Sequence, residues 1–330
     1  MKRRSTLTLL ASLALPLLAI AQAPPSQLAA PSLEATEEMK VFLTQNNIHS
    51  GQSPLLKMQR ILDALYADDN AFTYSASETL NAEQAFQERR GNCVSFAMLF
   101  VTLAREVGLE ARFNQIDYSP TWEEINGIFI ETSHINAIVT VGGNQYVVEG
   151  LPEYAEVASR SRNPVSDQRV LSHYYNNSGL LALARDNIES AKAFIDRAIE
   201  IDPSNSIAWQ NLGLYHFRQG NRKDGETALL NAADRSSQSA SVCYLLSQYY
   251  EQTGDQAKAE RFAKLGAKRS KKNPFFHYKQ SRDALAAGDL KKSIKHLEKA
   301  LQLLPRYTRF QLELANLKAD LASEDSLARR

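Results

Sequence analysis

Apolar residues recur with a helical period through the segment that follows Cys93. They fall at i, i+3, i+4, i+7, i+8 and i+11, and they are Phe96, Leu99, Phe100, Leu103, Ala104 and Val107. This spacing predicts a helix with one face in a core. Asn92 can cap its start and Gly108 can end it.

Shorter periodic segments lie on both sides of this helix. A helical rhythm predicts helices over Glu34–Leu43, Pro54–Tyr66 and Asn81–Arg89. Segments rich in apolar and β-branched residues predict strands over Leu109–Ile116, Thr132–Val141 and Gln145–Gly150. Gly142-Gly143 is a two-residue turn between the last two strands. We therefore expect a mixed α+β domain over residues 33–165.

The C-terminal half repeats with a period of 34 residues. Turn glycines keep this step at Gly220, Gly254 and Gly288. Small residues keep it at two more positions, which are Ala191, Gly225, Ala259 and Ser293, and Ala198, Ala232, Gly266 and Ala300. Pro203 and Pro305, three steps apart, end the first and last units. Small residues let paired helices pack closely, and the turn between them needs glycine or a pair such as Asp186-Asn187.

This pattern, with the W-x2-L-G sequence of Trp209, Leu212 and Gly213, resembles the tetratricopeptide repeat (TPR) family. The resemblance covers the units 172–205, 206–239, 240–273 and 274–307. It implies an all-α solenoid that holds a protein or peptide segment on its concave face, although such arrays also act as rigid spacers. Thr308–Ser323 predicts one more helix, and we expect residues 308–330 to form a capping helix and a charged tail.

The first 21 residues have the pattern of a secretory signal peptide. Lys2, Arg3 and Arg4 precede the apolar run Leu7–Ile20, and Ala19-Ile20-Ala21 is a small-x-small cleavage site. The alternative is an uncleaved anchor, but the run is short for a bilayer span of about 20 residues. We expect cleavage after Ala21, a leader linker over residues 22–32, no stable membrane span after processing, and a periplasmic or secreted product.

Composition changes this picture only in part. The chain has 330 residues, 44% hydrophobic and 23% charged, which excludes wholesale disorder and favours two domains. The formal charge of +1 becomes −2 without the signal segment, so nucleic acid is not an expected partner. Lys258–Lys299 nevertheless holds 13 Lys/Arg and four Asp/Glu. It is either a solvated helix face or a docking surface for an acidic partner or an anionic envelope polymer.

The two cysteines lie 150 residues apart, in different predicted domains, so we expect no disulfide between Cys93 and Cys243. Cys243 occupies an apolar position of its repeat and is interpreted as a buried structural thiol. His49 and His173 are interpreted as surface or cap residues at the domain edges. No histidine pair has metal-ligand spacing and no phosphate-binding glycine loop occurs, so we expect no metal and no cofactor.

Cys93 is the candidate nucleophile, because it begins a helix, where free N–H groups and the helix dipole favour thiolate. The alternative is a small buried core residue. If Gly142-Gly143 is the loop, Val141 pairs with Asn144 and Asn136 lies opposite Glu149. His134 is then one diagonal away on the same face, within reach of the glutamate. A shift of one residue in register would separate them.

The order cysteine, histidine and carboxylate on a helix and two strands resembles the transglutaminase-like, papain-like superfamily over residues 75–150. The resemblance rests on Gly91-Asn92-Cys93, Arg105–Arg112, His134 and Glu149. It implies that the cysteine attacks an amide or thioester carbonyl, that the histidine acts as base and then acid, and that a carboxylate orients the ring. Glutamate here replaces the usual aspartate.

Two functions remain open from the sequence. One is an exported cysteine enzyme, either a protease or amidase or a transamidase, that uses Cys93, His134 and Glu149. Further cleft candidates are Gln115, Asn136 and Trp122, of which Gln115 is also a candidate oxyanion donor beside the Cys93 N–H. The other function is a catalytically inactive domain that serves with the TPR array as a binding scaffold.

Overall fold

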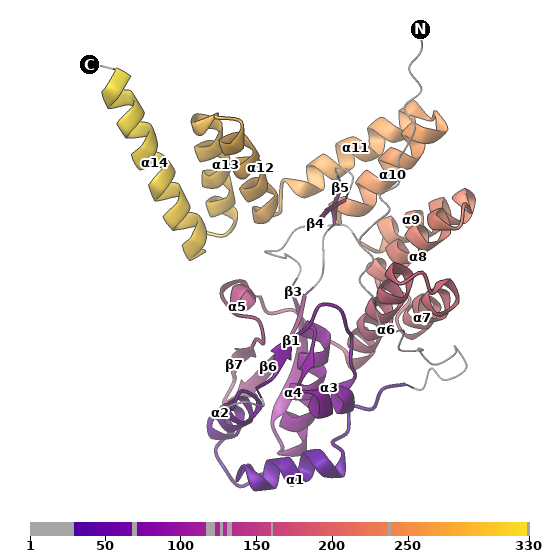
Figure 1. Ribbon diagram of the computed structural model, residues 1–330, viewed down its shortest axis with the longest axis vertical. Helices are drawn as coiled ribbons and strands as arrows, with labels where there is room; N and C mark the ends of the chain where they lie inside the picture. Colours follow the sequence, from indigo (N-terminus) through magenta and orange to yellow (C-terminus); the bar gives the residue numbers. More distant parts are fainter. Residues whose placement is uncertain are drawn as a thin grey trace.

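The computed structural model describes residues 30–67, 71–116, 123–125, 128–130, 134–159, 161–236 and 239–328. The predicted signal segment Met1–Ala21, nearly all of the leader and Trp122 lie outside these ranges. A mixed α/β region comes first along the chain and an array of helices follows it (Figure 1). The fold class is therefore the one predicted from the sequence.

Helix α4 (Cys93–Glu106) is the centre of the N-terminal domain. Every residue from Val94 to Ala104 is buried, and Asn92 caps the first turn by accepting a hydrogen bond from the Ser95 N–H at 3.1 Å. Three other helices contribute to the same core, namely α1 (Glu37–Gln45), α2 (Pro54–Leu65) and α3 (Ala82–Glu88). The three predicted helices are present, with ends that differ from the prediction by at most three residues.

A four-stranded antiparallel sheet covers one side of α4, in the order β7-β6-β3-β8. Its strands are β3 (Glu110–Ile116), β6 (His134–Val141), β7 (Asn144–Val148) and β8 (Pro164–Val165). Val141 pairs with Asn144 across the turn at Gly142 and Gly143, which both have positive φ. The predicted hairpin register is therefore correct.

Several elements were not predicted. Strands β1 (Thr73–Tyr74) and β2 (Arg90–Gly91) form a short parallel pair before α4. Strands β4 (Glu123–Ile125) and β5 (Ile128–Ile130) form an antiparallel pair, and β5 lies against the array helix α10. Helix α5 (Pro152–Ala158) follows β7.

The array consists of helix pairs, each closed by a short turn. The first two pairs are α6 (Asp167–Ala184) with α7 (Ile188–Ile201), and α8 (Ser206–Arg218) with α9 (Arg222–Arg235). The next two are α10 (Ala240–Thr253) with α11 (Gln256–Ser270), and α12 (Pro274–Ala286) with α13 (Leu290–Leu303). Helix α14 (Thr308–Ala328) packs on α13.

The turns between paired helices use a left-handed residue, as the 34-residue period predicts. Asp186, Gly220, Gly254 and Gly288 all have positive φ, between 61° and 85°. Cys93 and Cys243 do not form a disulfide, and Cys243 is fully buried in α10. Among the described residues, no helix combines the length and the apolar content that crossing a bilayer requires.

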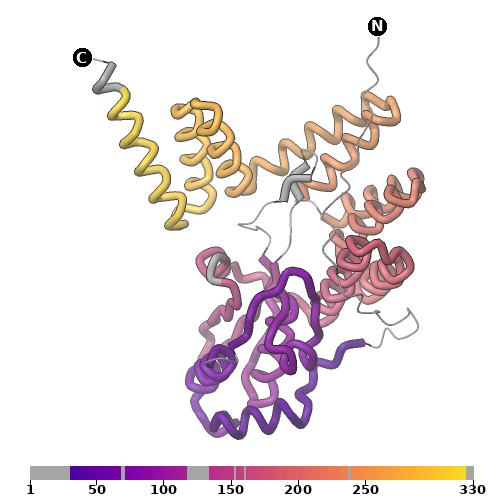
Figure 2. Tube along the Cα trace, viewed as in Figure 1, coloured from indigo at the N-terminus to yellow at the C-terminus, as the bar shows by residue number. Residues whose placement is uncertain are grey.

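The array contacts the N-terminal domain at both of its ends. At the first end, Arg105 of α4 forms two hydrogen bonds with Asp167 of α6, at 2.7 and 2.9 Å. At the last end, Ile116 and residues of α5 share a buried apolar cluster with α12, α13 and α14. Figure 2 shows the array extending away from the domain after α6, with its last helices lying above α5.

The buried face of α4 gives a prediction about stability. Leu99 is fully buried and Leu312 of α14 is 62% exposed. We expect Leu99→Ala to lower the free energy of unfolding by about 2–5 kcal/mol, because it leaves a cavity in the core. Chemical denaturation measures this, with Leu312→Ala as the matched control that changes little. Equal losses in the two variants would contradict the placement of α4.

Candidate active site

The backbone before Cys93 has room only for glycine. Gly91 has φ of 150°, and a Cβ built on it would lie 2.4 Å from Cβ of Ser95. Ser95 Oγ accepts a hydrogen bond from the Leu80 N–H at 2.8 Å, and the Asn92 side chain donates to Thr79 at 2.7 Å. These contacts fix the start of α4 and so the position of the Cys93 thiol.

The Cys93 thiol is partly buried and has a lowered pKa. Burial alone raises the pKa of a thiol, but the hydrogen bond and the charge of His134 and the backbone of Ile135 lower it, and these effects prevail. Cys93 is also the first residue of α4, where helical N–H groups favour an anion. Cys93 therefore has the environment of a reactive cysteine rather than that of an inert core residue.

His134, the first residue of β6, is hydrogen-bonded to Glu149. Its Nε2 lies 2.8 Å from Oε2 of Glu149, and the two side chains are 3% and 6% exposed. Because Nε2 is engaged by the carboxylate, Nδ1 is the nitrogen that can exchange a proton with Cys93. Glu149 reaches the ring along the diagonal that the hairpin register predicts. The additional methylene of glutamate, compared with aspartate, spans this diagonal.

The pKa of His134 is raised to about 9. Burial opposes the shift, but hydrogen bonding and charge from Cys93 and then from Glu149 outweigh it. A raised imidazole pKa beside a lowered thiol pKa shifts the pair toward thiolate and imidazolium. This is the ionisation state in which a cysteine is nucleophilic and a histidine can donate a proton.

Two buried asparagines support Glu149 from behind. Asn136 donates to Glu149 Oε2 at 3.0 Å, and its own Oδ1 accepts from Asn114 at 2.8 Å. The Leu151 N–H donates to Glu149 Oε1 at 2.9 Å. The sequence analysis named Asn136 as a candidate cleft residue. Asn136 is 1% exposed, so it does not line an open cleft. It instead fixes the carboxylate that orients His134.

Tyr154 of α5 is a site residue that the sequence analysis missed. Its ring stacks on the imidazole of His134, with centroids 3.8 Å apart and planes 18° apart. The signal that could have revealed α5 is Pro152 at the start of a short segment whose apolar residues recur at Tyr154, Val157 and Ala158.

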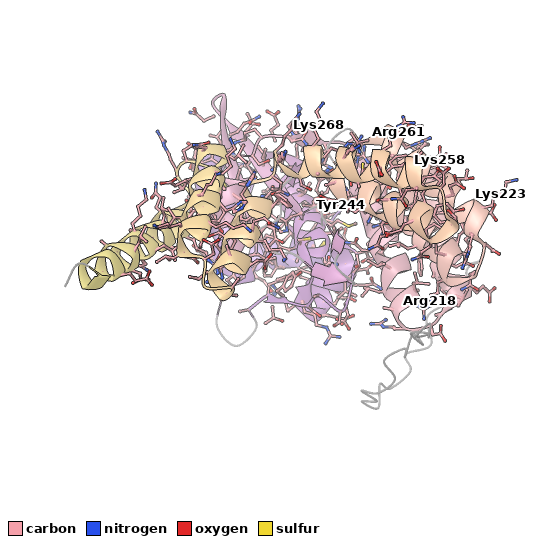
Figure 3. All side chains as sticks on the ribbon, turned by 90° about the horizontal axis from the view of Figure 1, so that it is seen from above. Arg218, Lys223, Tyr244, Lys258, Arg261 and Lys268 are labelled. Atoms are coloured by element: carbon pink, nitrogen blue, oxygen red, sulfur yellow. The ribbon has the colours of Figure 1, made fainter. Side chains whose placement is uncertain are left out.

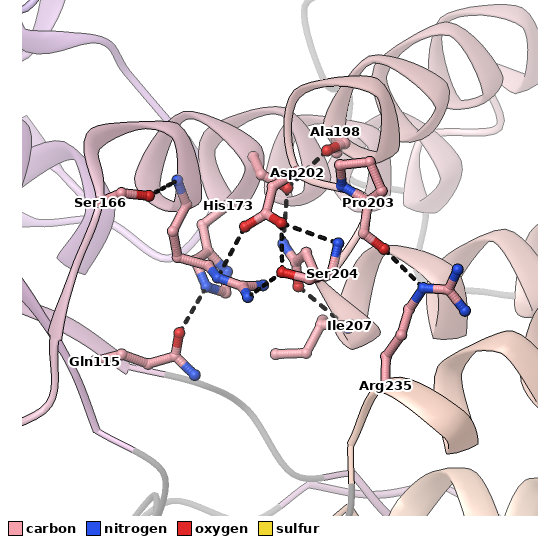
Figure 4. A network of polar contacts seen from close by, with 12 residues as sticks. Gln115, Ser166, His173, Ala198, Asp202, Pro203, Ser204, Ile207 and Arg235 are labelled. Carbon is pink, nitrogen blue, oxygen red and sulfur yellow. Dashed lines mark hydrogen bonds and ion pairs between the residues drawn. The ribbon is translucent and has the colours of Figure 1, made fainter.

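Gln115 and His173 meet at the junction with the array (Figure 4). His173 Nε2 lies 3.3 Å from Gln115 Oε1, and burial lowers the pKa of His173 to about 4. His173 is 3% exposed, so its interpretation as a surface or cap residue was wrong. Gln115 pairs with Ile135 in the sheet, and its oxyanion role stays a prediction.

The same junction joins the first two helix pairs. Arg169 of α6 bonds Asp202 at 3.0 Å, and Asp202 accepts from the N–H and the hydroxyl of Ser204 (Figure 4). Within the described ranges, no three His, Cys, Asp or Glu side chains are grouped in a way that would hold a metal ion.

Two family models match the chain. The model of the transglutaminase-like superfamily matches residues 43–149, which include Cys93, His134 and Glu149. A tetratricopeptide repeat model matches residues 176–241 and 211–274. No curated protein matches the sequence.

Solved structures resemble parts of the chain at low identity. PilF of Pseudomonas aeruginosa is 20% identical over 48% of this chain and 72% of its own, with a TM-score of 0.31. MamA is 16% identical over 48% of this chain and 86% of its own, with a TM-score of 0.28. YrrB, described as a TPR protein with an unusual peptide-binding site, is 15% identical over 46% and 78%, with a TM-score of 0.28. These scores are too low to support a shared function.

The family matches agree with the helix order and with the side chains that meet at Cys93. The chain carries a transglutaminase-like domain over residues 43–149, followed by tetratricopeptide repeats over residues 176–274.

Proposed function

We propose that this protein is an exported cysteine enzyme that acts on peptide or isopeptide bonds through Cys93, His134 and Glu149. The observation that carries the proposal is the buried His134–Glu149 pair beside a thiol whose pKa is lowered. The raised pKa of His134 supports the same assignment, because it supplies the proton that a leaving amine needs.

The proposed reaction has two steps. The Cys93 thiolate attacks the carbonyl carbon, an S–C bond forms, and the C–N bond breaks as His134 gives its proton to the leaving amine. Water or a second amine then attacks the acyl-enzyme, His134 takes the proton of that nucleophile, and the thiolate leaves. Water gives hydrolysis and an amine gives transamidation. Glu149 orients the imidazole throughout.

The alternative function, a scaffold without catalysis, was motivated by glutamate in place of aspartate. Glu149 nevertheless contacts His134 at 2.8 Å, so the longer glutamate side chain is able to reach and orient the imidazole. The signal segment of the sequence supports action in the periplasm or outside the cell, on envelope proteins or cell-wall peptides.

TPR repeats are a module of the kind that binds protein or peptide partners. We place a protein or peptide segment on the concave face of the array, and an acidic partner at the basic region Lys258–Lys299. Lys258, Arg261 and Lys268 project from the same side of α11 (Figure 3), and Lys264 is 81% exposed. An acidic partner would be attracted to this positive surface. Added salt would weaken the attraction, because it screens the exposed charges.

The reactivity of Cys93 tests the catalytic proposal. At neutral pH we expect iodoacetamide to modify Cys93 faster than an unperturbed cysteine, because its lowered pKa supplies more thiolate. His134→Ala should slow modification about tenfold or more if it raises the pKa of the Cys93 thiol by at least one unit. Mass spectrometry of the labelled peptide measures both rates, in a Cys243→Ser background. The scaffold alternative predicts an ordinary rate that His134→Ala leaves unchanged.

The charge of Glu149 gives a second prediction. Glu149 is one of the groups that raise the pKa of His134 to about 9. Glu149→Gln removes that charge, so His134 should lose its proton at a lower pH, and the alkaline limit of activity should move down with it. NMR titration of the imidazole measures the shift. Glu200→Gln, in α7 and 69% exposed, is the control and should leave the titration of His134 unchanged; an unchanged titration in Glu149→Gln would contradict the assigned role.

The basic side of α11 gives a third prediction. Replacing Lys258, Arg261, Lys264 and Lys268 with serine should weaken binding of a polyglutamate peptide and reduce its dependence on salt. The control replaces Lys40, Lys192, Lys223 and Lys318, which removes the same charge from elsewhere. Titration by fluorescence anisotropy compares the two variants. Equal binding by both would show that the region Lys258–Lys299 is only a solvated helix face.

A further inference from the structure

Helix α5 lies between the catalytic histidine and the end of the TPR array. On one side, Tyr154 stacks on His134 with a centroid separation of 3.8 Å. On the other, residues of α5 belong to a buried apolar cluster with the last helices of the array; the cluster includes Leu151, Tyr154, Val157, Ala158, Phe275, Leu297, Tyr307 and Phe310. The active site and the array therefore share one packed group of side chains.

A polar contact joins α5 to the first residue of α14. Oε1 of Glu156 accepts a hydrogen bond from the Thr308 N–H at 2.8 Å and lies 3.3 Å from the Thr308 hydroxyl. A carboxylate at this place satisfies a free N–H at the helix start and interacts favourably with the helix dipole. Because 152 residues separate the two partners in sequence, this contact forms only when the array has returned to the domain.

The stacking adds a restraint to a ring that is already hydrogen-bonded to Glu149 and to Cys93. A ring held by these two bonds could still tilt about the line that joins them, and such a tilt would weaken the bond between Nδ1 and Cys93. The face of Tyr154 fixes the plane of the ring, favours the imidazolium form and keeps water from the His134–Glu149 bond. Tyr154 is 6% exposed, so it is itself held by its surroundings.

We propose that Tyr154 is a positioning residue for His134, and that helices α12 to α14 hold it there through α5. The inference rests on the proposed function and adds to it. The last helices of the array then do more than present a binding surface, because they support the active site of the other domain. A partner that displaces α14 from α5 would lower the reactivity of Cys93.

Among the described residues, the titratable groups that act on His134 are Cys93 on α4 and Glu149 after β7. Tyr154 on α5 stacks on the ring, and Tyr66 at the end of α2 is near the Glu149 carboxylate. Changes on α14 leave all of these groups in the chain. A shift in the pH profile after a change on α14 therefore reports the position of α5 rather than a lost charge.

The experiment measures the rate of iodoacetamide modification of Cys93 against pH in the full-length Cys243→Ser protein. Tyr154→Leu should move the midpoint of the profile to higher pH, and a shift of one unit slows modification about tenfold at a pH below both midpoints. Tyr154→Phe keeps the ring and should retain the wild-type profile. Phe310→Ala and Glu156→Ala should shift the profile in the same direction as Tyr154→Leu.

Leu246→Ala is the control, because Leu246 is as deeply buried as Phe310 but belongs to the separate cluster around α10. It should lower the stability of the array and leave the pH profile unchanged. Wild-type profiles in Tyr154→Leu, Phe310→Ala and Glu156→Ala would overturn the inference while leaving the proposed function intact. An ordinary thiol profile in the unmodified protein would instead overturn the proposed function.

Discussion

The hydrogen bond between His134 and Glu149 is the interaction on which the arrangement of this protein depends. A charged pair that is almost fully buried is costly unless every partner is in place. The hairpin register brings Glu149 to the ring of His134. Asn136 and the Leu151 N–H donate hydrogen bonds to the Glu149 carboxylate, and Asn114 donates to Asn136. The result is a histidine whose pKa is raised next to a thiol whose pKa is lowered.

This pair also explains why the two domains are assembled as they are. One face of the sheet packs on the core around α4. The opposite face of the sheet carries His134, Asn136 and Ile116, which are buried and must be covered by other elements. Helix α5 supplies part of that shelter, and the apolar cluster shared with α12 to α14 supplies more. The salt bridge between Arg105 and Asp167 secures the opposite end of the array. The array thus contacts the transglutaminase-like domain at both of its ends (Figure 1).

Local patterns of sequence predicted the fold and the three central side chains, because each was encoded by neighbours. The apolar spacing after Cys93 predicted α4, and the two-glycine turn predicted the register that joins His134 to Glu149. What failed depended on distant segments. Tyr154 and the burial of His173 are determined by packing between the domain and the array, and no period within either segment encodes that contact.

The ionisation of Cys93 tests the central claim most directly. In a Cys243→Ser protein, the ultraviolet absorbance of thiolate can be followed against pH, with Cys93→Ser as the blank. We expect Cys93 to remain thiolate below its ordinary pKa and His134→Ala to move the transition upward. A transition at the ordinary thiol pKa, unchanged by His134→Ala, would contradict it.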